Sequence, residues 1–216
     1  MRSPSAAPIR HDLVLVGGGH AHIQVLRRWA MAPVPGARLT LVVDRPVAVY
    51  SGMVPGFVAG QYARDDLEID VRPLALRAGA RCIVGPATGL DPGARRLLLQ
   101  GRPPIAYDTV SFDVGSTVAG LGLPGVAEHA VPTRPIGEFV RRVDQVLAAA
   151  RSRDAARLVV VGAGAGGVEV AFALAARLRD DRARRVQVAL LESGPRVLPG
   201  YAASAAARVE AAATAR

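Results

Sequence analysis

Three glycines, Gly162, Gly164 and Gly167, have the spacing G-x-G-x-x-G between an apolar β-branched run and a stretch with helical spacing. In such a strand–turn–helix the first glycine permits a tight turn and the second lets the backbone approach a diphosphate. The third lets the helix pack closely on the strand. The next apolar run, residues 186–191, ends at Glu192, an acid placed to bind ribose hydroxyls. This stretch predicts a dinucleotide site, and a purely structural turn is the alternative.

A second, imperfect copy of this pattern lies near the N-terminus, at residues 13–22 (LVLVGGGHAH). Gly17 and Gly19 occupy the first two glycine positions, but His22 occupies the third. A histidine there should push the helix away from the strand or require altered packing. Taken alone, this copy fits a nucleotide site and an ordinary glycine turn equally well. Asp44, at the end of the next apolar run, favours the nucleotide site because it has the spacing of a ribose-binding acid.

Histidine and cysteine side chains offer other chemistry. His20 and His22, with His11 upstream, suggest a metal, but no carboxylate or cysteine spacing matches a known type of site, so we predict none. The single cysteine, Cys82, lies in a short apolar run and is expected to be a small core side chain. With one cysteine the chain has no C-x-x-C redox pair, which argues against a disulfide reductase within these residues.

The composition is that of a globular protein. The 216 residues are 50% hydrophobic and 21% charged, and the 27 basic residues, all arginine, give a net charge of +9. These arginines are scattered singly and in pairs, and aromatic residues make up only 4%, so we predict no nucleic-acid partner. No signal-peptide core and no apolar run long enough to span a membrane is present, which predicts a cytoplasmic protein.

The motifs indicate an α/β fold with two Rossmann-like domains, each built on a parallel sheet. We expect a leader at residues 1–11, a first nucleotide-binding domain at 12–150 and the N-terminal part of a second at 151–216. Turn signals predict a small antiparallel insertion at about 80–106, which includes the apolar run at 81–85.

Several connecting segments also give expectations. The glycine- and proline-rich stretch 50–60 is expected to be a loop, either a buried connector or a wall beside a flat ring. Alternating apolar residues predict a strand over 67–71, and the three prolines of 120–135 indicate a crossing loop. Helical spacing predicts helices over 136–147 and 202–216. Because about 60 residues cannot complete a dinucleotide domain, we expect both domains to be incomplete and the polypeptide to be truncated.

In their order along the chain these motifs resemble the pyridine nucleotide-disulfide oxidoreductase superfamily, and within it the type II NADH dehydrogenases and sulfide:quinone reductases. The resemblance covers about residues 12–216, the N-terminal part of such an enzyme. The variants VGGGHAH and YSGMVPG are similar to the FAD-dependent dehydrogenase found fused to selenide, water dikinase.

The resemblance implies two cofactors, FAD and NAD(P)H. The residues it implies for FAD are Gly17, Gly19, His22, Asp44 and Gly115. For NAD(P)H they are Gly162, Gly164, Gly167 and Glu192. Glu169 matches a glutamate near the nicotinamide and is the candidate catalytic residue. Glu192 favours NADH because a carboxylate repels the 2′-phosphate of NADPH, and Arg196, four residues on, carries a positive charge that can soften that preference.

The implied activity is hydride transfer from NAD(P)H to FAD and electron transfer to an acceptor such as a quinone. The resemblance also leaves open a peripheral contact with the inner face of the membrane and a link to selenide, water dikinase. One alternative is a catalytically incomplete fragment or a nucleotide-binding module without turnover. The other is an enzyme similar to sulfide:quinone reductase, whose cysteines would have to lie beyond these residues.

Overall fold

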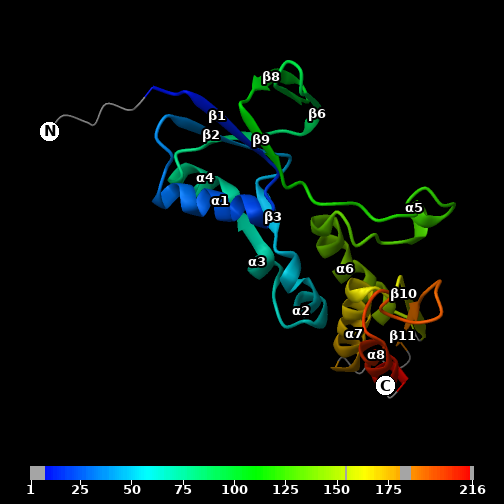
Figure 1. Ribbon diagram of the computed structural model, residues 1–216. Helices are drawn as coiled ribbons and strands as arrows, with labels where there is room; N and C mark the ends of the chain where they lie inside the picture. The colour runs from blue at the N-terminus through cyan, green and yellow to red at the C-terminus, as the bar shows by residue number, and fades with distance from the viewer. Residues whose placement is uncertain (1–7, 154, 181–185, 215–216) are drawn as a thin grey trace. The chain divides into compact units, whose positions relative to one another are not determined.

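In the computed structural model, residues 8–153, 155–180 and 186–214 are described, and they group into two compact units (Figure 1). The first unit contains residues up to Tyr50 together with Glu68–Ala119. The second contains Ser51–Leu67 together with the residues from Gly120 on. Residues 51–67 and 120–150, which we expected in the first nucleotide-binding domain, therefore group with the second unit.

A four-stranded parallel sheet forms the centre of the first unit, in the order β5-β2-β1-β9. Its strands are β1 (His11–Val16), β2 (Ala37–Val43), β5 (Arg81–Val84) and β9 (Thr109–Phe112). Helix α1 (His20–Met31) connects β1 to β2, which confirms the predicted strand–helix–strand unit. The expected leader lies mostly outside the described residues, and its last residue, His11, already belongs to β1.

The sheet is buried on both faces, as expected of parallel strands rich in Val and Leu. On one face Leu15 and Leu41 pack with Leu26 of α1 and with α4 (Val71–Arg77). On the other face Val14, Val16 and Val42 pack against Leu97 and Leu99. A separate antiparallel sheet supplies these two leucines, so the insertion covers the face that α1 leaves open.

That insertion is shorter than predicted. It comprises β6 (Ala87–Asp91), β7 (Arg96–Leu99) and β8 (Arg102–Ala106), which pair antiparallel. The run at 81–85 was wrongly assigned to it, because β5 pairs parallel to β2, with Cys82 opposite Leu41. The turn signal at residues 91–93 marks the hairpin of the insertion, but it does not show whether the apolar strand before that hairpin joins it or the main sheet.

The stretch 50–60 is not a loop but forms a 3₁₀ turn at Ser51–Met53 followed by helix α2 (Val54–Ala59). Pro55 stands in the first turn, where it costs no hydrogen bond, and Gly60 ends the helix at φ 84°, in the left-handed region. The strand predicted over residues 67–71 is also shorter in the structure. Only β4 (Glu68–Asp70) is extended, paired antiparallel with β3 (Val47–Val49), and α3 (Arg64–Leu67) and α4 flank it.

The second unit is built on two parallel strands, β10 (Ala156–Val161) and β11 (Val186–Leu191). Helix α7 (Ala165–Asp180) connects them and packs on both, and α2 packs against α7. The remaining helices are α5 (Val126–His129), α6 (Ile136–Arg151) and α8 (Ala203–Thr214). The predicted helices over 136–147 and 202–216 are thus present, although the last two residues of the second lie outside the described part. The segment 120–135 contains the short α5 within the expected loop.

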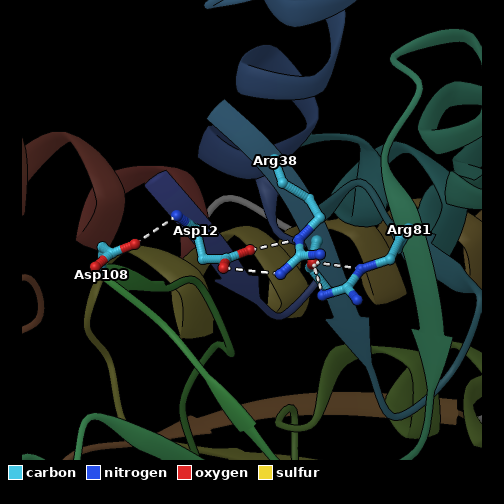
Figure 2. A network of polar contacts seen from close by, with 5 residues as sticks. Asp12, Arg38, Arg81 and Asp108 are labelled. Carbon is cyan, nitrogen blue, oxygen red and sulfur yellow. Dashed lines mark hydrogen bonds and ion pairs between the residues drawn. The ribbon is translucent and has the colours of Figure 1, made fainter. Parts of the chain in front are cut away.

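Polar contacts bind the strands together at the amino end of the first sheet (Figure 2). The Asp12 carboxylate accepts from Nε and Nη2 of Arg38 at 2.6 and 2.8 Å, and the Asp12 N–H donates to Asp108 Oδ2 at 2.7 Å. Arg81 donates to the hydroxyl of the fully buried Thr40 at 2.9 Å. The Arg38 hydrogen bonds lower the pKa of Asp12. This end of the sheet is occupied by one ion pair and several hydrogen bonds, whereas the glycine turn lies at the opposite, carboxyl end.

Candidate dinucleotide sites

The first glycine turn follows β1 at the carboxyl edge of the sheet. Gly17 has φ 96°, and its N–H donates to the carbonyl of Val42 at 2.8 Å. A Cβ at Gly17 would lie 2.9 Å from the Val114 nitrogen and closer still to the Asp113 carbonyl. Both the backbone conformation and this close approach to the chain after β9 therefore require glycine.

His22, the departure from the glycine pattern, is 2% exposed, and its imidazole makes two hydrogen bonds. Its Nδ1 lies 2.8 Å from the carbonyl oxygen of Gly17, and its Nε2 lies 2.9 Å from the hydroxyl of Ser111 in β9. The structure thus accommodates a histidine at the third glycine position by burying and hydrogen-bonding its ring. The imidazole is held between the turn and β9 and fully satisfied there, which the spacing of glycines alone could not reveal.

Asp113, which the sequence analysis missed, caps helix α1 from the end of β9. Its Oδ2 accepts from the N–H of Ala21 at 2.9 Å and from that of His22 at 3.3 Å. The residue at the N-cap position, Gly19, makes no side-chain cap hydrogen bond. A carboxylate from the neighbouring strand thus satisfies N–H groups that a helix start leaves free, and its charge is favourable there. The signal in the sequence was weak, an acid at the end of β9 and a helix that follows three glycines, and only the pairing of β9 with β1 brings the two together.

The other residues predicted for the first site lie along the same edge. Asp44 follows β2, is exposed, and contacts Arg45 through the Arg45 N–H at 2.9 Å and Nε at 3.3 Å. Gly115, in the turn after β9, has φ 81°, and a Cβ there would meet nothing within 4 Å. Because ligands of open parallel sheets bind outside the carboxyl ends of the strands, the structure brings all the predicted residues of this site to a suitable edge.

The second glycine turn, between β10 and α7, meets the fingerprint in full. Gly162 has φ 95°, and its N–H donates to the carbonyl of Leu191 at 2.8 Å. A Cβ at Gly167 would lie 3.0 Å from the Gly162 carbonyl carbon and closer to its oxygen, so the helix packs tightly on the turn. A Cβ at Gly164 would meet nothing within 4 Å. The space above the second glycine is open to a ligand.

Glu192 lies beside this turn and hydrogen-bonds to it. Its Oε2 accepts from the N–H of Ala163 at 2.7 Å, and its Oε1 accepts from the N–H groups of Ser193 and Gly194 at 2.8 and 3.2 Å. These bonds, that from Ala163 foremost, lower the pKa of Glu192, which keeps the side chain ionised. The Ala163 carbonyl accepts from the Leu198 N–H at 2.8 Å, which holds the following loop against the turn.

Two further predicted residues also lie in the second unit. Glu169 is exposed on the second turn of α7. Arg196 is exposed too, and its guanidinium donates to the carbonyl of Tyr201 at 3.1 Å rather than to Glu192. Glu192 and Arg196 therefore form their hydrogen bonds with different parts of the chain.

A cavity of about 850 Å³ also lies in the second unit, between α7 and β11. Apolar side chains, among them Val168, Phe172 and Val188, line it, and neither Gly164 nor Glu192 does. It is therefore separate from the residues predicted to bind a nucleotide. Among the described residues, no three His, Cys, Asp or Glu side chains gather as metal ligands. Over the same residues, no helix combines the length and apolarity that a membrane crossing needs.

The two units have parallel strands, a glycine turn between strand and helix and an acid after the next strand, which defines an α/β protein with two Rossmann-like units. The chain belongs to the pyridine nucleotide-disulphide oxidoreductase family, whose sequence profile matches residues 11–216. This confirms the predicted superfamily.

Among curated proteins, the chain is similar to the NADH dehydrogenase-like protein YutJ of Bacillus subtilis (strain 168). The two are 26% identical over 198 residues, which are 88% of this chain and 50% of that protein. The chain thus spans about half the length of this relative.

Solved structures confirm the fold. The sulfide:quinone oxidoreductase of Aquifex aeolicus matches 95% of this chain and 49% of its own, with a TM-score of 0.78 at 20% identity. The water-forming NADH oxidase of Lactobacillus brevis, bound to NADH, matches 95% and 45%, with a TM-score of 0.74 at 18% identity. NDH2 of Plasmodium falciparum matches 92% and 44%, with a TM-score of 0.77 at 14% identity.

Proposed function

We propose that the first unit binds FAD, that the second binds NADH, and that the protein passes a hydride from NADH to FAD and electrons onward to an acceptor. The observation that carries this proposal is the presence of two glycine turns, each at the carboxyl end of a parallel strand and each with an acid beyond the next strand. The chain's family and its likeness to a protein named NADH dehydrogenase-like support the same assignment.

The first site offers backbone amides to an anionic dinucleotide, next to the Asp113 carboxylate that occupies the space above the second glycine of the turn. Within the described residues the N–H groups of Gly18 and His20 have no hydrogen-bond partner, so both remain for a diphosphate at the start of α1. Asp44 is exposed at the end of β2, where its carboxylate can accept from ribose hydroxyls. Gly115, with open space in place of a Cβ, lets a ligand approach the turn after β9.

The second site fits NADH. The open space above Gly164 admits the diphosphate, and Glu192 lies one hydrogen bond from the turn that would hold it. An ionised carboxylate accepts from both ribose hydroxyls of NADH and repels the extra phosphate of NADPH. The Arg196 guanidinium donates to the Tyr201 carbonyl rather than to Glu192. Glu169 is the residue we assign to the neighbourhood of the nicotinamide.

FAD, when bound, supplies the redox chemistry, while the protein binds and orients the two cofactors. The first unit holds the diphosphate on the α1 amides, and the second orients NADH through Glu192 and the Gly162–Gly167 turn. A quinone is the acceptor we favour, with a peripheral membrane contact. The sequence variants VGGGHAH and YSGMVPG support a further link to selenide, water dikinase. The fold likeness to sulfide:quinone oxidoreductase extends to no cysteine pair, because Cys82 is the single cysteine.

The proposal is tested on purified full-length protein by its visible spectrum and by anaerobic addition of NADH or NADPH. We expect bound flavin whose absorbance bleaches with NADH and much more slowly with NADPH, and reoxidation by a soluble quinone. Protein without flavin, or flavin that NADH does not bleach, would instead favour a nucleotide-binding module without turnover. A faster reaction with NADPH would contradict the role assigned to Glu192.

A further inference from the structure

The two glycine turns differ in what occupies the space above the second glycine. In the second unit that space is open, since a Cβ at Gly164 would meet nothing within 4 Å. In the first unit a Cβ at Gly19 would overlap the carboxylate of Asp113. Gly19 is therefore required by a side chain of the protein itself, whatever ligand the turn also receives.

We infer that Asp113 is a positioning residue for the FAD site, which fixes the start of α1 so that its remaining amides face the diphosphate. This inference rests on the proposed function of the first unit. Asp113 accepts from the second and third residues of α1, Ala21 and His22. The N–H groups of Gly18 and His20, just before these, are the ones without a partner among the described residues. The carboxylate and the diphosphate thus use different amides of one helix end.

Such an anchor is needed because the first turn lacks the third glycine. In the second unit α7 packs directly on its turn, with no room for a Cβ at Gly167. In the first unit the His22 imidazole takes that place. Its Nδ1–H donates to the Gly17 carbonyl, and its Nε2 then accepts from the Ser111 hydroxyl. Asp113 and His22 together hold α1 to the end of β9, and His22 also holds it to the turn.

A competing interpretation predicts the opposite change in FAD affinity when Asp113 is removed. A carboxylate at a helix start attracts the same amides as a phosphate and repels a phosphate nearby. If Asp113 competed with the diphosphate for the amides of Ala21 and His22, its removal would strengthen FAD binding. If it positions α1, its removal weakens FAD binding despite the loss of a negative charge. The direction of the change therefore decides between the two.

The test uses full-length Asp113→Ala and Asp113→Asn proteins, with Asp91→Ala as the matched control. Asp91 also accepts from a backbone N–H through its carboxylate, that of Ala94 in the β6–β7 turn. After removal of the flavin, the dissociation constant for FAD is measured by quenching of flavin fluorescence, and that for NADH by calorimetry. Amide hydrogen exchange of the apoprotein reports on Ala21 and His22.

We expect Asp113→Ala to weaken FAD binding at least tenfold, about 1.4 kcal/mol. Asp113→Asn, which keeps one acceptor oxygen, should fall between it and the wild type. The dissociation constant for NADH should not change in either variant, and Asp91→Ala should leave both constants unchanged. A merely structural loss would not select FAD over NADH. Exchange at Ala21 and His22 should be slow in the wild type and faster in both Asp113 variants.

Unchanged or tighter FAD binding in Asp113→Ala would overturn the inference. If Asp113→Ala does not fold, Asp113→Asn decides, and FAD binding equal to that of the wild type would overturn it. If the wild type binds no FAD, the proposed function of the first unit fails, and the positioning role for FAD fails with it. In that event slow exchange at Ala21 and His22 would still establish Asp113 as the helix cap, so the two failures can be told apart.

Discussion

The strongest test of the second site compares alanine at two glycines three residues apart. At Gly164 a Cβ would meet nothing within 4 Å, and φ is outside the left-handed region, so the methyl group fits the folded protein. Alanine restricts the unfolded chain, which stabilises by about 0.4–1 kcal/mol, but it is a poorer residue before a helix. These effects oppose each other, so the free energy of unfolding should change by less than about 1 kcal/mol.

The same methyl group stands where the NADH diphosphate must approach the backbone. We expect Gly164→Ala to weaken NADH binding at least a hundredfold, about 2.7 kcal/mol. Gly167→Ala should behave differently, because its Cβ would lie 3.0 Å from the Gly162 carbonyl carbon and closer to the oxygen. The helix must then shift, and such overpacking costs typically about 1–3 kcal/mol of stability.

Urea denaturation measures the free energy of unfolding, and calorimetry measures the dissociation constant for NADH. Gly164→Ala should fold like the wild type and lose NADH, and Gly167→Ala should lose stability. Flavin content should be retained in Gly164→Ala, since this residue belongs to the other unit. If Gly164→Ala bound NADH with wild-type affinity, the diphosphate would not lie over this glycine, and the assignment of the second site would be refuted.

Three further predictions concern charged and buried groups. Asp12→Asn should lower the free energy of unfolding by about 0.5–1 kcal/mol in urea at pH 7, because it removes the ion pair with Arg38. That pair lowers the pKa of Asp12, so its contribution to stability is present above the ordinary carboxyl pKa and is lost as the pH falls below about 4. In that acid range the unfolding free energies of wild type and variant should converge. Glu192→Gln should raise the dissociation constant for NADH and narrow the preference over NADPH in bleaching assays; an unchanged preference would refute its role. His22→Ala should lower the thermal midpoint and reduce the free energy of unfolding in urea by about 2–3 kcal/mol, because Ser111 and the Gly17 carbonyl lose their partner. Wild-type stability in this variant would show that the imidazole does not anchor α1.

Much of the fold followed from local patterns. The strands β1, β2, β10 and β11 are rich in Val and Leu, and each pair is separated by a helical stretch, which defines parallel strand–helix–strand units. The stretch 50–60 was predicted wrongly because glycine and proline were taken as breakers. In the structure Pro55 lies in the first turn of α2 and Gly60 at its end, positions where both residues suit a helix.

The site was predictable only in part. The glycines and the acids Asp44 and Glu192 follow from spacing along one strand–turn–helix unit. Asp113 could not be found that way, because it contacts Ala21 across 92 positions of sequence, through the pairing of β9 with β1. The hydrogen bond of His22 to Ser111 has the same origin. Contacts that depend on which strands are neighbours need the topology of the sheet, which motifs do not contain.

Helix α2 has a consequence for synthesis of the protein. Val54, Phe57 and Val58 of α2 are buried, and α2 packs against α7. α7 begins roughly a hundred residues later in the chain. At about 5–20 residues per second, the ribosome needs about 5–20 seconds to produce that partner. During this interval α2 is an apolar segment of the nascent chain whose partner α7 does not yet exist. Exposed apolar segments of this kind are what chaperones bind.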